Sequence, residues 1–208
     1  MHGEIPSVLI IDDDAEFRDS VARLLRTVGL HTREFSSVSD FLTAEPPDGP
    51  TCLVLDVRMP GRSGLELQRD LAAANRQVPI IFITAHADVP MTVQAMKGGA
   101  MEFLTKPFRD QELIDAIEAG LARDRARRES DKALARVREC FNALSSRERE
   151  ITLHVMAGRL NKQIAHEIGI AESTVKVHRT NLMRKMKAHS LPELSRMAAL
   201  LNLTPPQS

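Results

Sequence analysis

Short apolar runs alternate with amphipathic segments through the first half of this 208-residue chain. The apolar runs predict five β-strands, at residues 8–12, 31–35, 51–56, 80–84 and 101–104. Apolar residues at helical spacing mark the helices between them: Leu24, Leu25 and Val28; Phe41 and Leu42; Leu65, Leu67 and Leu71; Val93 and Met96. A fifth helix is predicted to begin near Asp110. This order predicts an α/β domain with a doubly wound, five-stranded parallel sheet covered by helices on both faces.

After this fifth helix begins, the pattern stays helical but becomes very polar. Residues 121–141, LARDRARRESDKALARVRECF, contain neither Pro nor Gly and offer two (i, i+4) ion pairs, Asp124 with Arg128 and Arg127 with Asp131. A long solvated helix is the natural interpretation, because these charges would interrupt the seam of a coiled coil. Apolar residues at three-to-four spacing predict packing near its end: Leu134, Val137, Phe141 and Leu144.

The remaining chain predicts four short helices. Their start signals are capping boxes at Ser145 with Glu148 and at Ser190 with Glu193, and a single cap at Asn161. The segment NKQIAHEIGIAESTVKVHRTNLMRKM has helix-turn-helix form, with Gly169 at the turn and a core of Ile164, Ala165, Ile168 and Val175. The predicted organisation is an α/β domain, a helical linker and a small all-α domain of four helices, at residues 1–122, 123–142 and 143–208.

A net charge of zero conceals a strong asymmetry between the two halves. Residues 1–120 hold 11 Lys and Arg against 19 Asp and Glu, a net charge of −8. Residues 121–208 hold 17 against 9, a net charge of +8. This asymmetry predicts that the second half meets a polyanion such as double-stranded DNA, with uneven surface charge and no partner as the alternative.

Several protein classes are disfavoured by the sequence. No apolar run approaches the roughly 18 residues that a membrane span needs. The first residues, MHGEIPS, lack the basic flank and apolar core of an export signal, so we expect a cytoplasmic protein with no membrane partner. Cys52 lies in an apolar run and Cys140 in a charged region, so we expect two reduced thiols and no disulfide.

Polar side chains end several strands of the predicted sheet. Asp12 ends the first strand, Asp56 the third and Thr84 the fourth, and Lys106 follows the fifth. The carboxyl ends of the strands are where doubly wound sheets bind their ligands. We therefore expect these four side chains to converge on one edge.

Asp12, Asp13 and Asp14 form a run of three carboxylates, which repel one another unless a cation is bound. Carboxylate oxygens suit a hard divalent cation, and Mg²⁺ usually takes one or two of them together with phosphate oxygens and water. The run therefore predicts a site for Mg²⁺ or Mn²⁺. Asp14 is assigned instead to the first turn of the first helix, where its charge stabilises the helix N-terminus.

Four segments carry a resemblance to a known family: IIDDD, LVLDVRMPGRSG, FITAH and FLTKPF. In this order and spacing they resemble the receiver domain of two-component response regulators, over about the first 120 residues. The resemblance implies a flavodoxin-like sheet and a phosphoryl group received from a sensor histidine kinase. It also implies a cis peptide bond between Lys106 and Pro107.

The resemblance further implies the roles of single residues. Asp56 would be the phosphoryl acceptor. Asp13, Asp56 and the backbone carbonyl of Arg58 would bind the metal directly, and Asp12 would act largely through water. Attack by a carboxylate on a phosphohistidine, with a metal neutralising the transferring group, matches the chemistry of these residue types.

By the same resemblance, Lys106 and the Thr84 hydroxyl would bind the other oxygens of the phosphoryl group. Thr84 and Phe103 would form a switch pair, in which the hydroxyl moves toward the phosphoryl group and the aromatic ring turns inward. This switch would reshape the surface of the fourth helix and fifth strand. We expect that surface to form a homodimer on phosphorylation through Val89, Pro90, Met91 and Val93.

The segment LSSREREITLHVMAGRLNKQIAHEIGIAESTVKVHRTNLMRKMKAHSLPEL is similar to the DNA-binding domain of LuxR-type regulators, so the chain resembles a FixJ/NarL-class response regulator. Its basic helix should expose Lys176, Arg179, Arg184 and Lys185, and a basic helix after a turn suits the major groove. The resemblance implies base reading by Lys176, Val177 and Thr180. It implies mainly phosphate contacts by Asn161, Lys162, His178, Arg179, Asn181 and Lys185. The alternative to DNA binding is a helix whose charges only keep it solvated. The alternative for His178 is packing inside the unit.

These observations favour a transcription regulator controlled by phosphorylation. One rival is an interaction module whose output is protein binding, with a regulatory second domain. A second rival is an enzyme, but the sequence shows no further nucleophile with a base and no cofactor loop. Its catalysis would be confined to its own aspartyl phosphate.

Overall fold

The chain folds into two compact units, residues 1–128 and 129–208. The computed structural model describes residues 5–203, so residues 1–4 of the N-terminal segment MHGEIPS lie outside the described part. Within that part, no helix combines the length and apolar character that crossing a membrane requires. Both cysteines are free thiols, as the sequence predicts.

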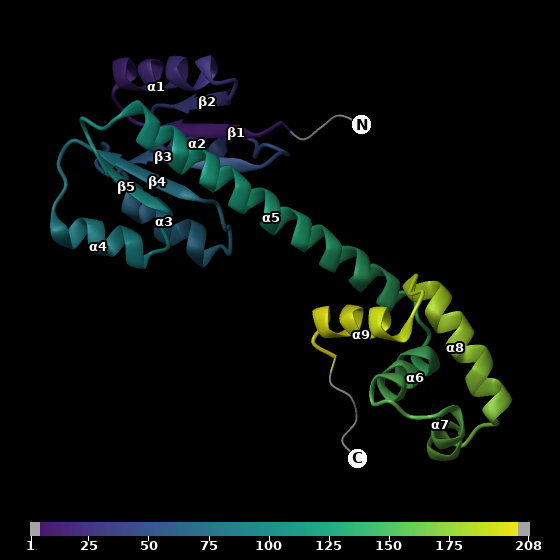
Figure 1. The fold of residues 1–208 in the computed structure, drawn as a ribbon. Helices are drawn as coiled ribbons and strands as arrows, with labels where there is room; N and C mark the ends of the chain where they lie inside the picture. The colour runs from purple at the N-terminus through teal and green to yellow at the C-terminus, as the bar shows by residue number, and fades with distance from the viewer. Residues whose placement is uncertain (1–4, 204–208) are drawn as a thin grey trace. The chain divides into compact units, whose positions relative to one another are not determined.

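The first unit is built on a parallel sheet with strands in the order β2-β1-β3-β4-β5 (Figure 1). The strands are β1 (Ser7–Ile11), β2 (His31–Phe35), β3 (Thr51–Asp56), β4 (Ile80–Thr84) and β5 (Glu102–Thr105). Ile11 at the end of β1 lies beside Phe35 and Leu55, so the carboxyl ends of the strands share one edge. The predicted fold class is confirmed, and each predicted strand lies within one residue of its observed bounds.

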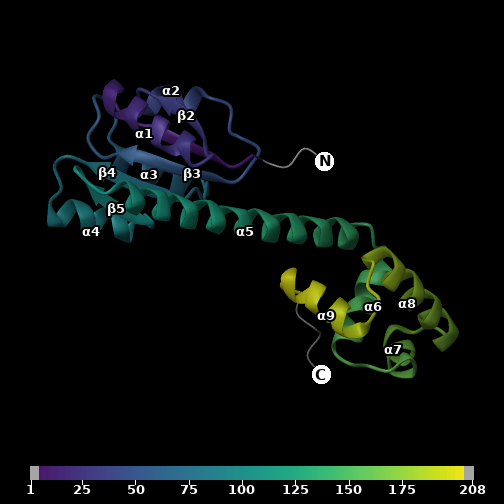
Figure 2. The same ribbon diagram turned by 45° about the horizontal axis from the view of Figure 1, so that its top comes forward.

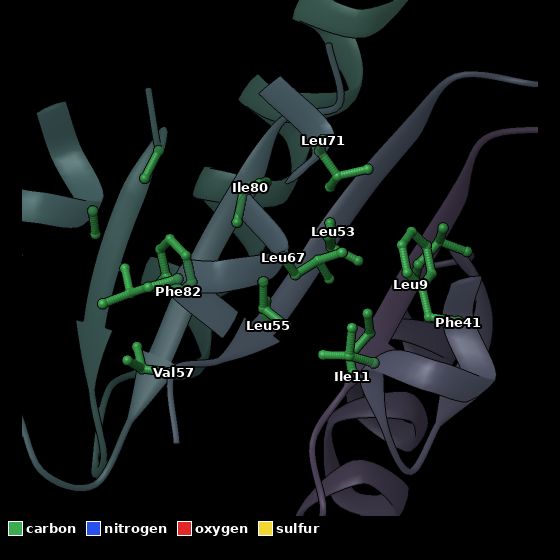
Figure 3. Packing of buried hydrophobic residues seen from close by; sticks show 14 residues of the cluster. Leu9, Ile11, Phe41, Leu53, Leu55, Val57, Leu67, Leu71, Ile80 and Phe82 are labelled. Atoms are coloured by element: carbon green, nitrogen blue, oxygen red, sulfur yellow. The ribbon is translucent and has the colours of Figure 1, made fainter. Parts of the chain in front are cut away.

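Helices cover both faces of the sheet (Figures 1 and 2). They are α1 (Ala15–Thr27), α2 (Val38–Thr43), α3 (Gly64–Ala73), α4 (Val89–Lys97) and α5 (Asp110–Asn142). Because alternate strand residues point to opposite faces, two separate cores form. One packs Leu25 of α1 and Ile117 of α5 on the sheet. The other packs Phe41 of α2 and Leu67 of α3 on the opposite face (Figure 3).

Some of the apolar residues whose spacing marks the helices are exposed: Val28, Leu42, Val93 and Met96. Val28 follows the last residue of α1 and therefore leaves the buried face of that helix. In α4 the residue that is buried is Ala95. Short apolar spacings are compatible with two faces of a helix, and only the tertiary contacts choose between them.

The prediction of a solvated polar helix is wrong for Asp124, whose side chain is only 1% exposed. It accepts hydrogen bonds from the backbone N–H of Thr51 at 2.9 Å and from Arg127 and Arg128 at 2.6 Å each. Arg128 also donates to the backbone carbonyl of Asp48. Burial alone would raise the pKa of Asp124, but these hydrogen bonds hold it below its ordinary value. They attach α5 to the start of β3.

The second unit contains α6 (Ser146–Met156), α7 (Asn161–Ile168), α8 (Glu172–Met186) and α9 (Leu191–Leu200). Gly169, with φ +68°, ends α7 in the left-handed region and permits the sharp turn into α8. Ile164, Ala165 and Val175 are buried, and Ile168 packs on the same core, as predicted. Leu144 is buried and Phe141 packs beside it, which accounts for the apolar spacing at the end of α5.

The predicted helix start signals of this unit are confirmed only in part. Ser145 and Glu148 form the predicted capping box. Ser190 accepts the backbone N–H of Glu193, but the Glu193 carboxylate accepts from His189, so the second box is only half formed. The predicted cap at Asn161 is wrong by one residue. Asn161 is the first residue of α7 and the extended Leu160 is its N-cap, whose backbone N–H donates to the Gln163 side chain at 2.7 Å.

Candidate functional site

The carboxyl edge of the sheet gathers the predicted acidic residues. Asp12 and Asp13 directly follow β1, and Asp56 ends the neighbouring strand β3. One carboxylate oxygen of each lies within 4.8 Å of the others. Asp12 is buried, Asp56 is half-buried and Asp13 is exposed. The cluster therefore opens to solvent on the side of Asp13.

Lys106 brings a positive charge to this cluster. Its Nζ lies 2.7 Å from Oδ2 of Asp12 in an ion pair that is largely shielded from solvent. Oδ1 of Asp12 accepts the backbone N–H of Asp14 at 2.9 Å. The peptide bond between Lys106 and Pro107 is cis, as the family resemblance implies. Lys106 is thus paired with one of the three clustered carboxylates, and the Arg18 guanidinium donates to the backbone carbonyl of Asp12 at 2.6 Å.

Asp14 is the N-cap of α1. Its side chain accepts the backbone N–H groups of Glu16 and Phe17 at 3.0 and 3.1 Å. These bonds satisfy two donors that a helix start leaves without partners. Of the three consecutive carboxylates, Asp14 therefore serves the helix, while Asp12 and Asp13 face Asp56.

The carboxyl group of Asp56 has a perturbed acidity. Burial and, second, the neighbouring charge of Asp12 raise its pKa from 3.8 to about 6. The backbone N–H of Arg58, 3.3 Å from Oδ1, and the charge of Lys106 oppose this shift without cancelling it. The cluster thus offers three carboxylates, of which Asp12 is paired with Lys106, and such oxygen ligands suit a hard divalent cation. The residues fit Mg²⁺ in number, type and proximity.

Thr84 and Phe103 occupy neighbouring strands close to the same edge. Thr84 ends β4, is 1% exposed, and accepts the backbone N–H of His86 through its hydroxyl at 3.3 Å. Phe103 is half-buried on β5, with its ring centroid 6.2 Å from that of Phe82. The structure brings Thr84 to the edge that the sequence predicts. The movement of the pair remains a prediction.

The predicted dimer surface on α4 is apolar and accessible. Val89 is 76% exposed and Val93 is 44% exposed. Pro90 is exposed as well, whereas Met91 is half-buried and packs partly on the core. Substitution of Val93 should therefore alter the surface without opening a cavity in the core.

The helix-turn-helix unit presents a solvent-facing row on α8. Lys176, Val177 and Thr180 are exposed, at the positions where the family resemblance implies base reading. Lys176 Nζ lies 3.2 Å from Glu172, one turn earlier on the same helix, and both side chains are largely solvent-accessible. Such an exposed pair holds Lys176 only weakly, so its ammonium stays available to a ligand.

Other residues expected at phosphates are partly engaged inside the unit. Arg179 donates to Oδ1 of Asn161 at 2.6 Å, and Lys185 Nζ lies 2.7 Å from the buried carboxylate of Glu148. The expectation that α8 exposes Arg179 and Lys185 is therefore correct only in part, since both are half-buried. Of the remaining candidates, Lys162 is exposed, and His178 and Asn181 are half-buried.

Glu148 is a structural residue whose second role the sequence reasoning missed. Besides completing its capping box with Ser145, its carboxylate pairs with Lys185 of α8. Burial would raise the pKa of Glu148, but the Lys185 ammonium and the Ser145 hydrogen bonds lower it. The capping pattern revealed the first role, and no local signal in the sequence reveals the second.

A receiver-like sheet joined to a helix-turn-helix unit defines a two-component response regulator with a DNA-binding domain. Two family models agree with this class: the response regulator receiver domain at residues 8–118, and bacterial regulatory proteins of the luxR family at residues 142–198. The chain therefore belongs to the transcriptional response regulators that join a receiver domain to a LuxR-type DNA-binding domain.

Individual relatives match along nearly the whole chain. Nodulation protein W of Bradyrhizobium diazoefficiens is 50% identical, over 95% of this chain and 87% of its own. Transcriptional regulatory protein FixJ of Azorhizobium caulinodans is 45% identical, over 95% of this chain and 94% of its own. The structure of the response regulator StyR is 47% identical and covers 94% of this chain and 98% of its own, with a TM-score of 0.87.

The perturbed pKa of Asp56 leads to a prediction about stability without divalent cations. The folded pKa of about 6 lies above the ordinary 3.8, so the folded state binds extra protons between these values. Stability should therefore fall as pH rises through this window, and the penalty is complete above it. Asp56→Asn should therefore make the protein more stable than wild type at neutral pH. This difference in stability should shrink as the pH falls toward about 4.

Urea unfolding in the presence of EDTA, at a series of pH values, would measure this difference. Asp19→Asn, on an exposed residue of α1, is the matched control and should follow wild type. A constant difference between Asp56→Asn and wild type from about pH 4 to 7 would contradict the assigned cause.

Proposed function

We propose that this regulator accepts a phosphoryl group on Asp56 from a sensor histidine kinase, and that phosphorylation promotes dimerisation and sequence-specific DNA binding. The observation that carries the proposal is the cluster of Asp12, Asp13 and Asp56 oxygens within 4.8 Å, with the Lys106 ammonium beside Asp12. A nucleophilic carboxylate, an acidic cation site and a fixed ammonium are the groups that phosphoryl transfer needs. We further propose a cytoplasmic location.

In the proposed reaction, a carboxylate oxygen of Asp56 attacks the phosphorus of a phosphohistidine in line. The new P–O bond forms as the P–N bond breaks, and the leaving imidazole takes up a proton. Asp12, Asp13, Asp56 and the backbone carbonyl of Arg58 would hold Mg²⁺, which supplies charge neutralisation when bound. Lys106 and the Thr84 hydroxyl bind the remaining phosphoryl oxygens.

The proposed response follows from the neighbouring strands. Thr84 turns toward the phosphoryl group and Phe103 turns inward, which changes the surface formed by α4 and β5. The exposed Val89 and Val93 then meet a second copy of the chain. Dimerisation presents two copies of α8 to a DNA site of two-fold symmetry.

In the proposed DNA complex, Lys176, Val177 and Thr180 read base edges in the major groove. The mainly phosphate-contacting residues are Asn161, Lys162, His178, Arg179, Asn181 and Lys185. We propose the functional boundaries 1–122 for the receiver, 123–142 for the linker and 143–208 for the DNA-binding domain. The net charge of +8 over residues 121–208 supports DNA over a purely regulatory second domain.

Removing the nucleophile tests the phosphoryl chemistry. Asp56→Ala should abolish incorporation of an acid-stable, hydroxylamine-labile phosphoryl group from a small phosphodonor with Mg²⁺, because no other carboxylate takes its place. Asp19→Ala, on the exposed side of α1, should be labelled like wild type. Full labelling of Asp56→Ala would disprove the assignment of the acceptor.

Two lysines test the division between base reading and phosphate contact. Lys176→Ala should weaken specific binding by about 1–3 kcal/mol and relax the preference at one base position. Lys162→Ala should weaken all sequences alike and reduce the salt dependence by about one phosphate contact. Lys162 is a cleaner choice than Lys185, whose removal would also leave the buried Glu148 without its ion pair.

Binding isotherms on specific and scrambled duplexes at several salt concentrations would separate these two effects. Equal losses of specificity for Lys176→Ala and Lys162→Ala would argue against base reading by Lys176.

A charge on α4 tests the dimer surface. Val93→Glu should keep the phosphorylated protein monomeric while leaving phosphorylation intact, because the two-fold axis brings each new carboxylate to an apolar patch or its own copy. Val28→Glu, equally exposed but outside this surface, is the matched control. Sedimentation with and without phosphodonor makes the measurement, and phosphorylation-dependent dimers of Val93→Glu would rule out this surface.

A further inference from the structure

The Lys106 ammonium has a second neighbour besides Asp12. Its Nζ lies 3.5 Å from the centroid of the Phe17 ring, well within the range of a cation–π interaction. The ion pair with Asp12, at 2.7 Å, is formed at the same time. Lys106 is thus held between one anion and one aromatic face.

The Phe17 ring is itself held in place. Phe17 is in the first turn of α1, and its backbone N–H is bound by the Asp14 cap at 3.1 Å. Its ring meets Phe108 edge to face, with centroids 6.2 Å apart and an interplanar angle of 87°. The ring also lines a cavity of about 490 Å³ together with Leu24 and Phe108. The capped first turn of α1 and packing of Phe17 on the core hold the ring in place, and the edge of Phe108 is one further contact.

The two partners of Lys106 behave differently in the proposed reaction. The Asp12 carboxylate must share its charge with the cation that the acidic cluster binds, which weakens the ion pair. The ring of Phe17 is neutral and attracts the ammonium through its quadrupole. It competes neither for the cation nor for phosphoryl oxygens.

We propose that Phe17 is a positioning residue for the phosphoryl chemistry. Its ring keeps the Lys106 ammonium at the acidic edge when the Asp12 carboxylate interacts with the metal. This inference rests on the proposed function, because it assumes that Lys106 binds a phosphoryl oxygen. Phe17 itself touches neither the phosphoryl group nor the nucleophile. Its contribution is the geometry of Lys106.

The first test needs no phosphodonor or metal. Protons on the ε-carbon of a lysine over an aromatic face are shifted upfield by the ring current. NMR of full-length wild-type protein should show this shift for Lys106, and Phe17→Leu should abolish it. Phe17→Tyr should retain it, as should Phe108→Leu, which removes the edge contact but keeps the ring below the ammonium. An unshifted Lys106 in wild type would overturn the proposal whether or not the variants fold.

The second test measures phosphorylation rate at saturating small phosphodonor and Mg²⁺. Phe17→Leu should slow it by about 2- to 30-fold, the range that a cation–π contact provides. Phe17→Tyr should stay within about twofold of wild type, since its ring also offers a π face. Equal loss in Phe17→Tyr and Phe17→Leu, or equal loss in Phe108→Leu and Phe17→Leu, would assign the effect to packing and overturn the proposal.

Failure of the two hypotheses can be distinguished. If wild-type protein is not phosphorylated on Asp56, the proposed function fails while the ring-current shift still reports the contact. If wild type is phosphorylated, Lys106→Ala is slow, and Phe17→Leu is as fast as wild type, then the proposed function stands and the role of Phe17 is refuted.

Discussion

Repulsion among carboxylates at close range governs the first unit. Asp12, Asp13 and Asp56 meet because parallel strands end at one edge. Burial of Asp56 and, second, the charge of Asp12 raise the pKa of Asp56 to about 6. The Lys106 ammonium offsets part of this negative charge through its ion pair with Asp12. In the proposed function, this arrangement of carboxylates is the site for a divalent cation and a phosphoryl group.

Some charged residues of the second unit hold its helices together, and others face solvent. Glu148 is buried, caps the start of α6 and pairs with Lys185 on α8, so it links the two helices. Arg179 and Asn161 link α8 to α7 in the same way. These contacts hold the basic helix in its orientation, while Lys176 and Val177 remain exposed. The positive charge of α8 therefore both orients the helix and supplies the surface proposed to meet DNA.

The polar helix α5 shows how a buried acid can hold an element in place. Asp124 accepts the otherwise unpaired N–H of Thr51 at the start of β3, and two arginines balance its charge. The strand that ends in Asp56 is therefore fixed to α5 at its other end. A buried carboxylate with several donors costs little to desolvate compared with an isolated one.

The sequence alone determined the order of strands and helices, the acidic edge and the helix-turn-helix, because each depends on short-range periodicity or on residues at strand ends. The capping residues Asp14 and Ser145 were also readable, since caps act within one helical turn. The exposure of Val93, the burial of Asp124, and the partners of Lys185 and Lys106 were decided by the tertiary structure. Each depends on atoms far apart in the chain, and local spacing carries no information about which of them meet.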